Sequence, residues 1–261
     1  MRRLLVLGGT GEAAALAEAA SDRFGLRLEI VTSLAGRTEH PSKIMGRVRI
    51  GGFGGADALG DYLRSEGFDA VIDATHPFAA RISESARIAC DSASVPRLVL
   101  TRDEWVIAPG DTWIEAEDAR AARALVPALG SRVFLTVGSR DLASFAGLKG
   151  CWFLVRLVEP PRVPLPFDAG SHELIIARGP FDAADERRLM QAHNIEVLVT
   201  KASGGAATWP KVLAARELAL PVIMLKRPGA VPGERVSSVK DALAWLERIL
   251  DGLDATAAGE S

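Results

Sequence analysis

The chain has 261 residues, enough for one large domain or two smaller ones, and its 48% hydrophobic and 25% charged residues exclude wholesale disorder. Lys and Arg total 31 against 33 Asp and Glu, so the formal net charge of -2 argues against a generally basic protein that binds nucleic acid. Cys90 and Cys151 lie far apart and no apolar run has the length of a membrane span, so we expect a cytoplasmic protein without disulfides or membrane contact.

The first half of the chain alternates short apolar runs with longer Ala- and Leu-rich segments of helical period. Strand runs that are apolar throughout are typical of a parallel sheet with helices on both faces. The sequence predicts strands at 4–7, 28–31, 48–50, 70–73 and 97–100, and helices at 12–20, 56–66 and 80–93.

The second half repeats this alternation, interrupted by four prolines between Glu159 and Pro166 that favour an extended loop. We therefore expect an α/β fold of two Rossmann-like domains with mostly parallel sheets and an interdomain cleft. The expected domains are residues 1–118 and 119–253, followed by a flexible tail at 254–261. The remaining predicted strands are 133–137, 152–155, 173–177, 197–200 and 222–225, and the helices are 119–128, 141–145, 183–193, 208–218 and 239–250.

A glycine turn follows the first predicted strand. The segment Gly9-Thr10-Gly11-Glu12-Ala13-Ala14 satisfies G-x-G-x-x-G/A and opens a predicted helix. Glycine allows a sharp turn and close approach of a pyrophosphate, and the helix N-terminus offers N–H groups to the anion. Glycine turns also join strands to helices for steric reasons alone, but the position in the first βα unit favours a dinucleotide site. Its predicted cofactor-binding residues are Gly9, Thr10, Gly11 and Glu12.

The end of the second predicted strand indicates which dinucleotide is bound. It carries no Asp or Glu to bind the ribose 2′-hydroxyl of NAD. Ser33, Arg37 and Thr38 stand there instead, and a guanidinium with two hydroxyls suits a 2′-phosphate. The alternative is that Arg37 is a solvated loop residue. The pattern predicts NADP(H) as the cofactor, bound by residues 1–118.

Polar side chains follow the strand predicted at 70–73. Asp73, Thr75 and His76 should project beyond the carboxyl end of the sheet, where ligands bind in open α/β folds. His76 can donate a proton to a substrate or polarise it, although an isolated histidine is more often a capping or packing residue. Asp73 equally suits a structural role within the turn. We predict Thr75 as a cofactor-binding residue and His76 as a catalytic one.

A second glycine-rich segment, Gly51-Gly52-Phe53-Gly54-Gly55, follows the strand predicted at 48–50. Four glycines in five positions indicate tight backbone geometry or close approach of a ligand. A flexible turn with Phe53 packed in the core is nearly as good an explanation.

Cationic loops follow strands in the second half. Lys201-Ala202-Ser203-Gly204-Gly205 places a lysine before a helix start, which suits a carboxylate or phosphate, although it is not a Walker A loop. Arg140 and Arg178 follow other strands, and each alone is more often solvated than ligating. Together these cations would suit a polyanionic substrate. The four histidines and two cysteines show no ligand spacing, so no metal site is predicted.

Five segments of the sequence, 7–13, 33–38, 51–55, 73–79 and 201–205, resemble in order and extent the precorrin-6A reductase family. The most specific of them are His76-Pro77-Phe78-Ala79 and Lys201-Ala202-Ser203-Gly204-Gly205. The resemblance implies NADPH-dependent reduction of the tetrapyrrole precorrin-6A to precorrin-6B in cobalamin biosynthesis. It also implies hydride transfer to a ring double bond with protonation, no metal or flavin, and cofactor and tetrapyrrole meeting between two Rossmann-like domains.

Site residues follow from this resemblance together with the loop analysis. His76 and Lys201 are the predicted catalytic residues, within a protein expected to be a monomer. Two alternatives stay open: an NADP-dependent reductase of another small acidic metabolite, and a non-catalytic NADPH sensor. The predicted substrate-binding residues are Gly52, Phe53, Gly54, Phe78, Ser139, Arg140, Arg178, Lys201, Ser203, Gly204 and Gly205.

Overall fold

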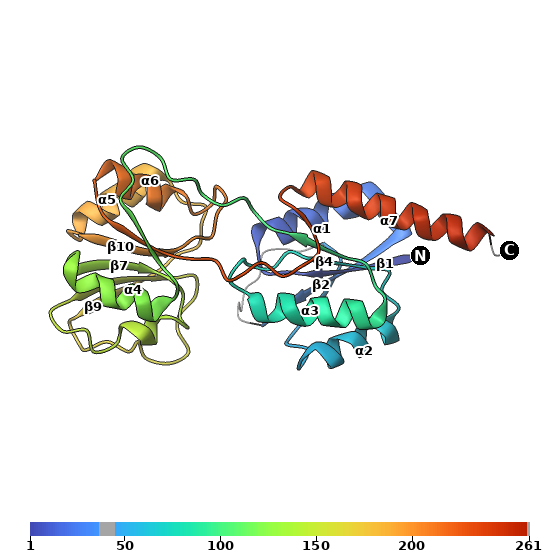
Figure 1. The fold of residues 1–261 in the computed structure, drawn as a ribbon, viewed down its shortest axis with the longest axis horizontal. Helices are drawn as coiled ribbons and strands as arrows, with labels where there is room; N and C mark the ends of the chain where they lie inside the picture. The colour runs from blue at the N-terminus through green and yellow to red at the C-terminus, as the bar shows by residue number, and fades with distance from the viewer. Residues whose placement is uncertain (37–44, 260–261) are drawn as a thin grey trace. The chain divides into compact units, whose positions relative to one another are not determined.

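The computed structural model describes residues 1–36 and 45–259. The chain divides into two compact units: Met1–Arg102 with Pro228–Ser261 form the first, and Asp103–Arg227 form the second (Figure 1). The chain therefore leaves the first unit once and returns to it at its C-terminal end.

A six-stranded sheet forms the centre of the first unit. Its strands are β1 (Arg2–Leu7), β2 (Leu28–Leu34), β3 (Arg47–Ile50), β4 (Ala70–Asp73), β5 (Arg97–Leu100) and β12 (Glu234–Val236). They lie in the order β12-β5-β4-β1-β2-β3, and every neighbouring pair is parallel. With β12 counted as the sixth strand, this is the 3-2-1-4-5-6 order of a Rossmann fold. The predicted parallel α/β fold is confirmed.

Helices cover both faces of this sheet, as Figure 1 shows. Successive strand residues point to opposite faces, so Val6 packs with Leu16 and Leu246, whereas Leu5 packs with Leu63 and Ala89. The first face carries α1 (Gly11–Phe24) and α7 (Val239–Gly259), and the second carries α2 (Ala56–Glu66) and α3 (Ala80–Ala93).

The second unit has the same architecture. Its strands are β6 (Trp113–Ala116), β7 (Arg132–Thr136), β8 (Trp152–Leu157), β9 (His172–Ile176), β10 (Val197–Lys201) and β11 (Val222–Leu225). Their order is β6-β11-β10-β7-β8-β9, again parallel throughout. Its helices are α4 (Ala119–Leu125), α5 (Ala183–Ala192) and α6 (Pro210–Glu217). The apolar cluster of Leu198 with Met190 and Val212 joins α5 and α6 to one face of the sheet, and α4 packs against β6 and β11.

The two units differ from the predicted division at residue 118. β12 pairs with β5 and belongs to the first sheet, although its residues lie within the predicted second domain. β6 pairs with β11 and belongs to the second sheet, although it precedes the predicted boundary. Both are short edge strands whose partners lie far away in the sequence. The predicted tail also differs, because α7 continues to Gly259 and Arg2 forms a 2.7 Å ion pair with Asp254.

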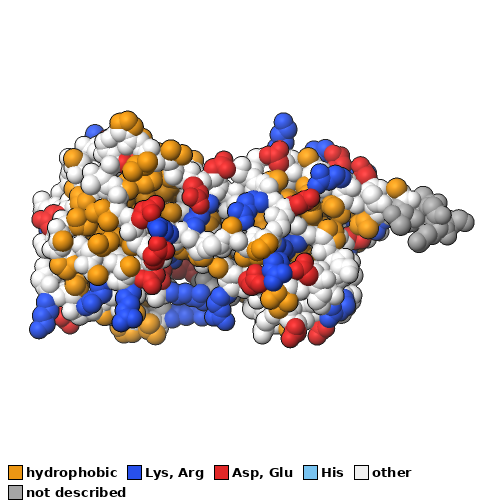
Figure 2. Space-filling view, in the orientation of Figure 1, with side chains coloured by type: hydrophobic (Ala, Val, Ile, Leu, Met, Phe, Trp, Pro, Cys, Tyr) orange, Lys and Arg blue, Asp and Glu red, His pale blue; other side chains and the backbone are white. Residues whose placement is uncertain are grey.

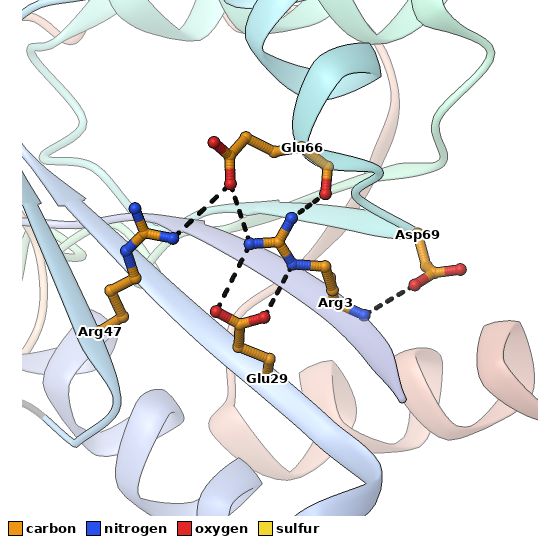
Figure 3. A network of polar contacts seen from close by, with 5 residues as sticks. All are labelled: Arg3, Glu29, Arg47, Glu66 and Asp69. Carbon is orange, nitrogen blue, oxygen red and sulfur yellow. Dashed lines mark hydrogen bonds and ion pairs between the residues drawn. The ribbon is translucent and has the colours of Figure 1, made fainter.

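A network of ion pairs and hydrogen bonds lies at the amino end of the first sheet (Figure 3). The Arg3 guanidinium lies 2.8 Å from Glu29 and 3.0 Å from Glu66, and Arg47 reaches Glu66 at 3.6 Å. The hydrogen bonds to Glu29 and then to Glu66 raise the pKa of Arg3 above its usual value, although burial opposes them. This network stabilises the end of the sheet opposite to the one at which ligands bind in such folds.

On the face drawn in Figure 2, acidic and basic side chains are intermixed on both units. Exposed hydrophobic side chains of the second unit include Val106, Val158 and Val163. Within residues 1–36 and 45–259, the helices are too short or too polar to cross a membrane.

Candidate functional site

Each sheet reverses its strand order at one place, between β1 and β4 in the first unit and between β7 and β10 in the second. In open α/β sheets, ligands bind beyond the carboxyl ends of the strands at this point. The glycine turn follows β1 and His76 follows β4, while Arg140 follows β7 and Lys201 ends β10. The structure thus brings the principal predicted residues of each unit to that unit's own switch point.

The glycine turn after β1 leaves its backbone open to the approach of a ligand. A Cβ added to Gly8 would lie 2.8 Å from Thr32 Cγ2, so this glycine is required for packing against β2. Gly9 has a φ of +110°, and Cβ atoms at Gly9 or Gly11 would meet nothing within 4 Å. These two positions therefore offer bare backbone facing open space, which is what a pyrophosphate requires.

Thr10 connects the two loops at the first switch point. It is the N-cap of α1: its hydroxyl accepts the N–H of Ala13 at 3.1 Å and donates to the carbonyl of Ala74 at 2.7 Å. The side chain of Thr10 is therefore a structural tie, and its contribution to cofactor binding would come from the backbone around it.

Glu12, in the first turn of α1, is ion-paired with Arg102 at 2.8 Å. Arg102 is largely buried, with 14% of its side chain exposed. The pair offsets the carboxylate charge that would otherwise oppose an anion at this helix N-terminus. The sequence patterns did not point to Arg102, although it is a cation two residues beyond the end of β5.

Asp73 organises the turn after β4. Its carboxylate is buried, and Oδ1 accepts hydrogen bonds from the Thr75 N–H at 3.1 Å and the Thr75 hydroxyl at 2.7 Å. The Thr75 hydroxyl also lies 3.3 Å from that of Ser83 on α3. These contacts favour the structural alternative for Asp73, and they give Thr75 a role in shaping the turn.

The turn also orients His76. The backbone N–H of Phe78 donates to Nδ1 of His76 at 3.2 Å, so a neutral His76 carries its proton on Nε2. The ring centroids of His76 and Phe78 lie 5.8 Å apart. His76 is half-buried beside the switch point and presents Nε2–H as its hydrogen-bond donor.

Of the other predicted cofactor and glycine-loop residues, those that the structure describes lie at the neighbouring strand ends. Ser33 is buried near the end of β2, whereas Arg37 and Thr38 lie outside the described residues. Phe53 packs against Tyr62 with ring centroids 5.4 Å apart, which supports the packing explanation for this loop. Gly52 and Gly54 are exposed.

At the second switch point, Lys201 Nζ lies 2.7 Å from Oδ2 of Asp141. Their side chains are 21% and 30% exposed, so the pair is accessible from solvent. Lys201 therefore acts together with a carboxylate from the loop after β7. Ser139 and Arg140 in that loop are exposed.

Two side chains missed by sequence analysis hold the loop after β10. Arg227 donates to the carbonyls of Ala202 at 2.8 Å and Ser203 at 3.0 Å. The Trp105 indole donates to the carbonyl of Gly205 at 2.8 Å. These donors hold three carbonyl groups of the loop in place. Gly204 and Gly205 allow the resulting turn of the backbone, with φ values of 68° and 71°. The backbone shape that sequence analysis attributed to Ser203, Gly204 and Gly205 is thus fixed by more distant residues.

The loop after β9 carries Arg178, which is exposed and lies 3.3 Å from Glu159. The position of this loop depends on a buried ion pair nearby. Arg156 is bound to Glu186 through both carboxylate oxygens, at 2.5 and 2.9 Å, and lies 3.8 Å from the centroid of the Phe181 ring. Phe181 therefore anchors this loop against β8.

A family model described as precorrin-6x reductase CbiJ/CobK matches residues 3–247. The chain belongs to this reductase family. A precorrin-6A reductase of Rhodococcus erythropolis is 49% identical over 94% of this chain and 98% of that protein. A precorrin-6A reductase of Rhodobacter capsulatus is 42% identical over 94% of this chain and 96% of that protein. The solved structure of a CobK precorrin-6A reductase superposes with a TM-score of 0.88 at 41% identity, covering 95% of this chain and 97% of that one.

Membership of the reductase family confirms the resemblance drawn from the sequence and identifies the protein as an oxidoreductase. Among residues 1–36 and 45–259, no group of three His, Cys, Asp or Glu side chains is arranged to hold a metal ion.

Proposed function

We propose that this protein reduces precorrin-6A to precorrin-6B in cobalamin biosynthesis, with NADPH as the reductant. The observation that carries the proposal is whole-length similarity to precorrin-6A reductases together with a Rossmann glycine turn at the first switch point. When bound, NADPH supplies a hydride to one ring double bond, and a proton completes the reduction.

The first unit is the proposed cofactor-binding unit. Its glycine turn fits a dinucleotide, because Gly9 and Gly11 leave open space where a pyrophosphate would lie and the N-terminus of α1 faces it. Thr10 and Thr75 hold the two loops in shape. Ser33 near the end of β2, with no Asp or Glu in the sequence from Val31 to Gly36, supports NADP(H) over NAD(H).

The second unit is proposed to bind the acetate and propionate side chains of the tetrapyrrole. Lys201 supplies a positive charge, held by Asp141, at the second switch point. Gly204 and Gly205 are proposed to supply backbone N–H groups, because the carbonyls of Ser203 and Gly205 are bound by Arg227 and Trp105. The Ser203 N–H donates to the carbonyl of Lys201 at 2.7 Å and holds the loop in shape. The exposed guanidinium groups of Arg140 and Arg178 can bind further carboxylates.

His76 is the proposed catalytic residue of the first unit. Because its Nδ1 accepts the Phe78 N–H, the hydrogen-bond donor it can offer a substrate is Nε2–H. We assign it to polarising the ring system that accepts the hydride. A proton on Nδ1, as in the imidazolium form, would break the contact with Phe78.

We further propose a monomeric protein in the cytoplasm that binds no nucleic acid. Trp245 and Leu246 of the long C-terminal helix are buried within the first unit, which supports a monomer. Cys90 and Cys151 are free thiols, which supports a reducing compartment.

The test is to follow the nicotinamide absorbance of NADPH with purified protein and precorrin-6A, with a simple carbonyl compound, or with neither. The proposal expects oxidation of NADPH with precorrin-6A alone, in equal molar amount to the precorrin-6B formed. Oxidation with the carbonyl compound would indicate a reductase of another metabolite. Binding of NADPH without oxidation in every case would indicate a sensor.

A further inference from the structure

We propose that Arg49 binds the 2′-phosphate of the cofactor and thereby sets the preference for NADPH over NADH. The inference rests on the cofactor-binding unit proposed above. It assigns a specificity-determining role to a side chain on β3, whereas sequence analysis looked for that role in the segment after β2.

The strand register places Arg49 beside Ser33. β2 and β3 are parallel, and Ser33 pairs with Arg49, so both side chains point to the same face near the carboxyl end of β2. Arg49 Nη1 lies 3.5 Å from Ser33 Oγ. Ser33 is only 7% exposed, so the two side chains form one partly buried polar group.

This place is where a 2′-phosphate would lie. A dinucleotide whose pyrophosphate occupies the turn after β1 has its adenosine ribose at the end of the second strand. The segment from Val31 to Gly36 contains no acid to bind a free 2′-hydroxyl. A guanidinium and a hydroxyl at this position are complementary to a phosphate.

The guanidinium of Arg49 is held in a fixed orientation. It lies 3.9 Å from the centroid of the Phe53 ring and 5.3 Å from that of Tyr62. It also donates to the carbonyls of Gly51 at 2.5 Å and Gly52 at 3.1 Å. An arginine immobilised before binding loses little side-chain entropy when a phosphate arrives.

Within the part of the chain that the structure describes, no acid offsets the charge of Arg49. Among residues 1–36 and 45–259 no carboxylate forms an ion pair with it, whereas Arg47 on the same strand reaches Glu66 at 3.6 Å. Its hydrogen bonds to described residues use three of the five guanidinium N–H donors. A charged group that packs on aromatic rings at a ligand-binding edge, with donors to spare, indicates an anionic ligand.

The experiment compares Arg49→Gln with Arg47→Gln, a control on the same strand that removes an equal charge. Binding of NADP⁺, NAD⁺, 2′,5′-ADP and 5′-AMP is measured by calorimetry for both variants and the unmodified protein. Arg49→Gln is expected to weaken NADP⁺ and 2′,5′-ADP by about 10- to 100-fold, the loss typical of a charge-assisted contact, with NAD⁺ and 5′-AMP nearly unchanged. Arg47→Gln is expected to change none of the four.

An equal loss of affinity for NADP⁺ and NAD⁺ in Arg49→Gln would show that Arg49 only shapes the glycine-rich segment after β3. Unchanged binding of NADP⁺ would also overturn the inference. If the glutamine variant does not fold, Arg49→Lys tests the same point, because it should weaken NADP⁺ selectively. A different result would count against the proposed function alone. In that case the unmodified protein would bind NADP⁺ in preference to NAD⁺ and Arg49→Gln would lose this preference, but the unmodified protein would not reduce precorrin-6A.

Discussion

Lys201 and Asp141 form a 2.7 Å ion pair that joins the end of β10 to the loop after the neighbouring strand β7. The pair stands at the switch point of its sheet, as the hydrogen bond from Thr10 to Ala74 stands at the switch point of the other. The carboxylate restrains the ammonium group at the carboxyl end of β10. A second carboxylate, from a ligand, would then bind a lysine that is already positioned.

We predict that Lys201→Ala raises KM for the tetrapyrrole or lowers kcat by about tenfold or more, since a hydrogen bond to a charged group contributes about 1.5–3 kcal/mol. The affinity for NADPH should stay nearly constant, because Lys201 belongs to the second unit. Steady-state kinetics and NADPH titration measure the two effects. Equal weakening of NADPH would show that the loop after β10 has been assigned to the wrong ligand.

Gly204 is the second position at which a substitution is informative. A Cβ there would overlap the carbonyl oxygen of Asp103 and the guanidinium of Arg227, and its φ of +68° is unfavourable for other residues. We predict that Gly204→Ala lowers the free energy of unfolding by about 1–3 kcal/mol and raises KM for the tetrapyrrole. Gly229→Ala is the matched control, because a Cβ at Gly229 would meet nothing within 4 Å. Denaturant unfolding that shows equal stability for both variants would contradict this account of the loop.

His76 offers a test of hydrogen bonding against proton donation. We predict that His76→Ala lowers kcat by about tenfold or more and that His76→Gln, which restores an N–H donor near the position of Nε2, recovers part of the loss. NADPH binding should be unaffected in both. The pH profile of kcat/KM should have the same shape in the unmodified protein and in His76→Gln, because a hydrogen-bond donor does not give up its proton. A loss of activity with rising pH that is present in the unmodified protein and absent from the Gln variant would establish His76 as an acid.

Asp111 makes stability depend on pH. Its side chain is 1% exposed and accepts hydrogen bonds from Arg216 at 2.8 and 2.9 Å. Burial acts to raise the pKa of Asp111, but the hydrogen bonds from Arg216 and from the Ala108 N–H outweigh it, so the pKa lies below its usual value. A carboxylate whose pKa is lowered in the folded state stabilises the protein at pH values above its unfolded-state pKa of about 3.9. This stabilisation is lost as the pH falls through the folded-state pKa.

We therefore predict that Asp111→Asn lowers the free energy of unfolding by about 1–3 kcal/mol at pH near 7. The difference from the unmodified protein should narrow as the pH is lowered below about 4. Urea unfolding at several pH values measures it. A difference that stays constant down to the acid limit would show that the carboxylate charge contributes nothing.

Much of the fold was predictable from the sequence because the central elements carry strong local patterns. The helices at 56–66 and 80–93 and the strands at 70–73 and 222–225 lie where the apolar periodicity placed them. β6 and β12 were missed, since three or four residues at a sheet edge carry little pattern. Their pairing with β11 and β5 depends on contacts between distant segments, and this is why the two compact units are not divided at residue 118.

The candidate site, like the fold, was predictable only in part from the sequence. Glycine turns and polar residues after strands pointed to Gly9, His76 and Lys201, because strand direction alone places them at the carboxyl edge. The side chains that hold these loops, such as Arg102 and Arg227, were not found. They lie on other strand ends, and only the folded sheet brings them to the loops.

The most direct measurement uses NADPH in which both hydrogens at C4 of the nicotinamide are deuterium, with precorrin-6A as the acceptor and the product analysed by mass spectrometry. Direct hydride transfer predicts a precorrin-6B molecule with one deuterium from the nucleotide and one proton from solvent. A product without deuterium from the nucleotide, or NADPH left unconsumed in the presence of precorrin-6A, would contradict it.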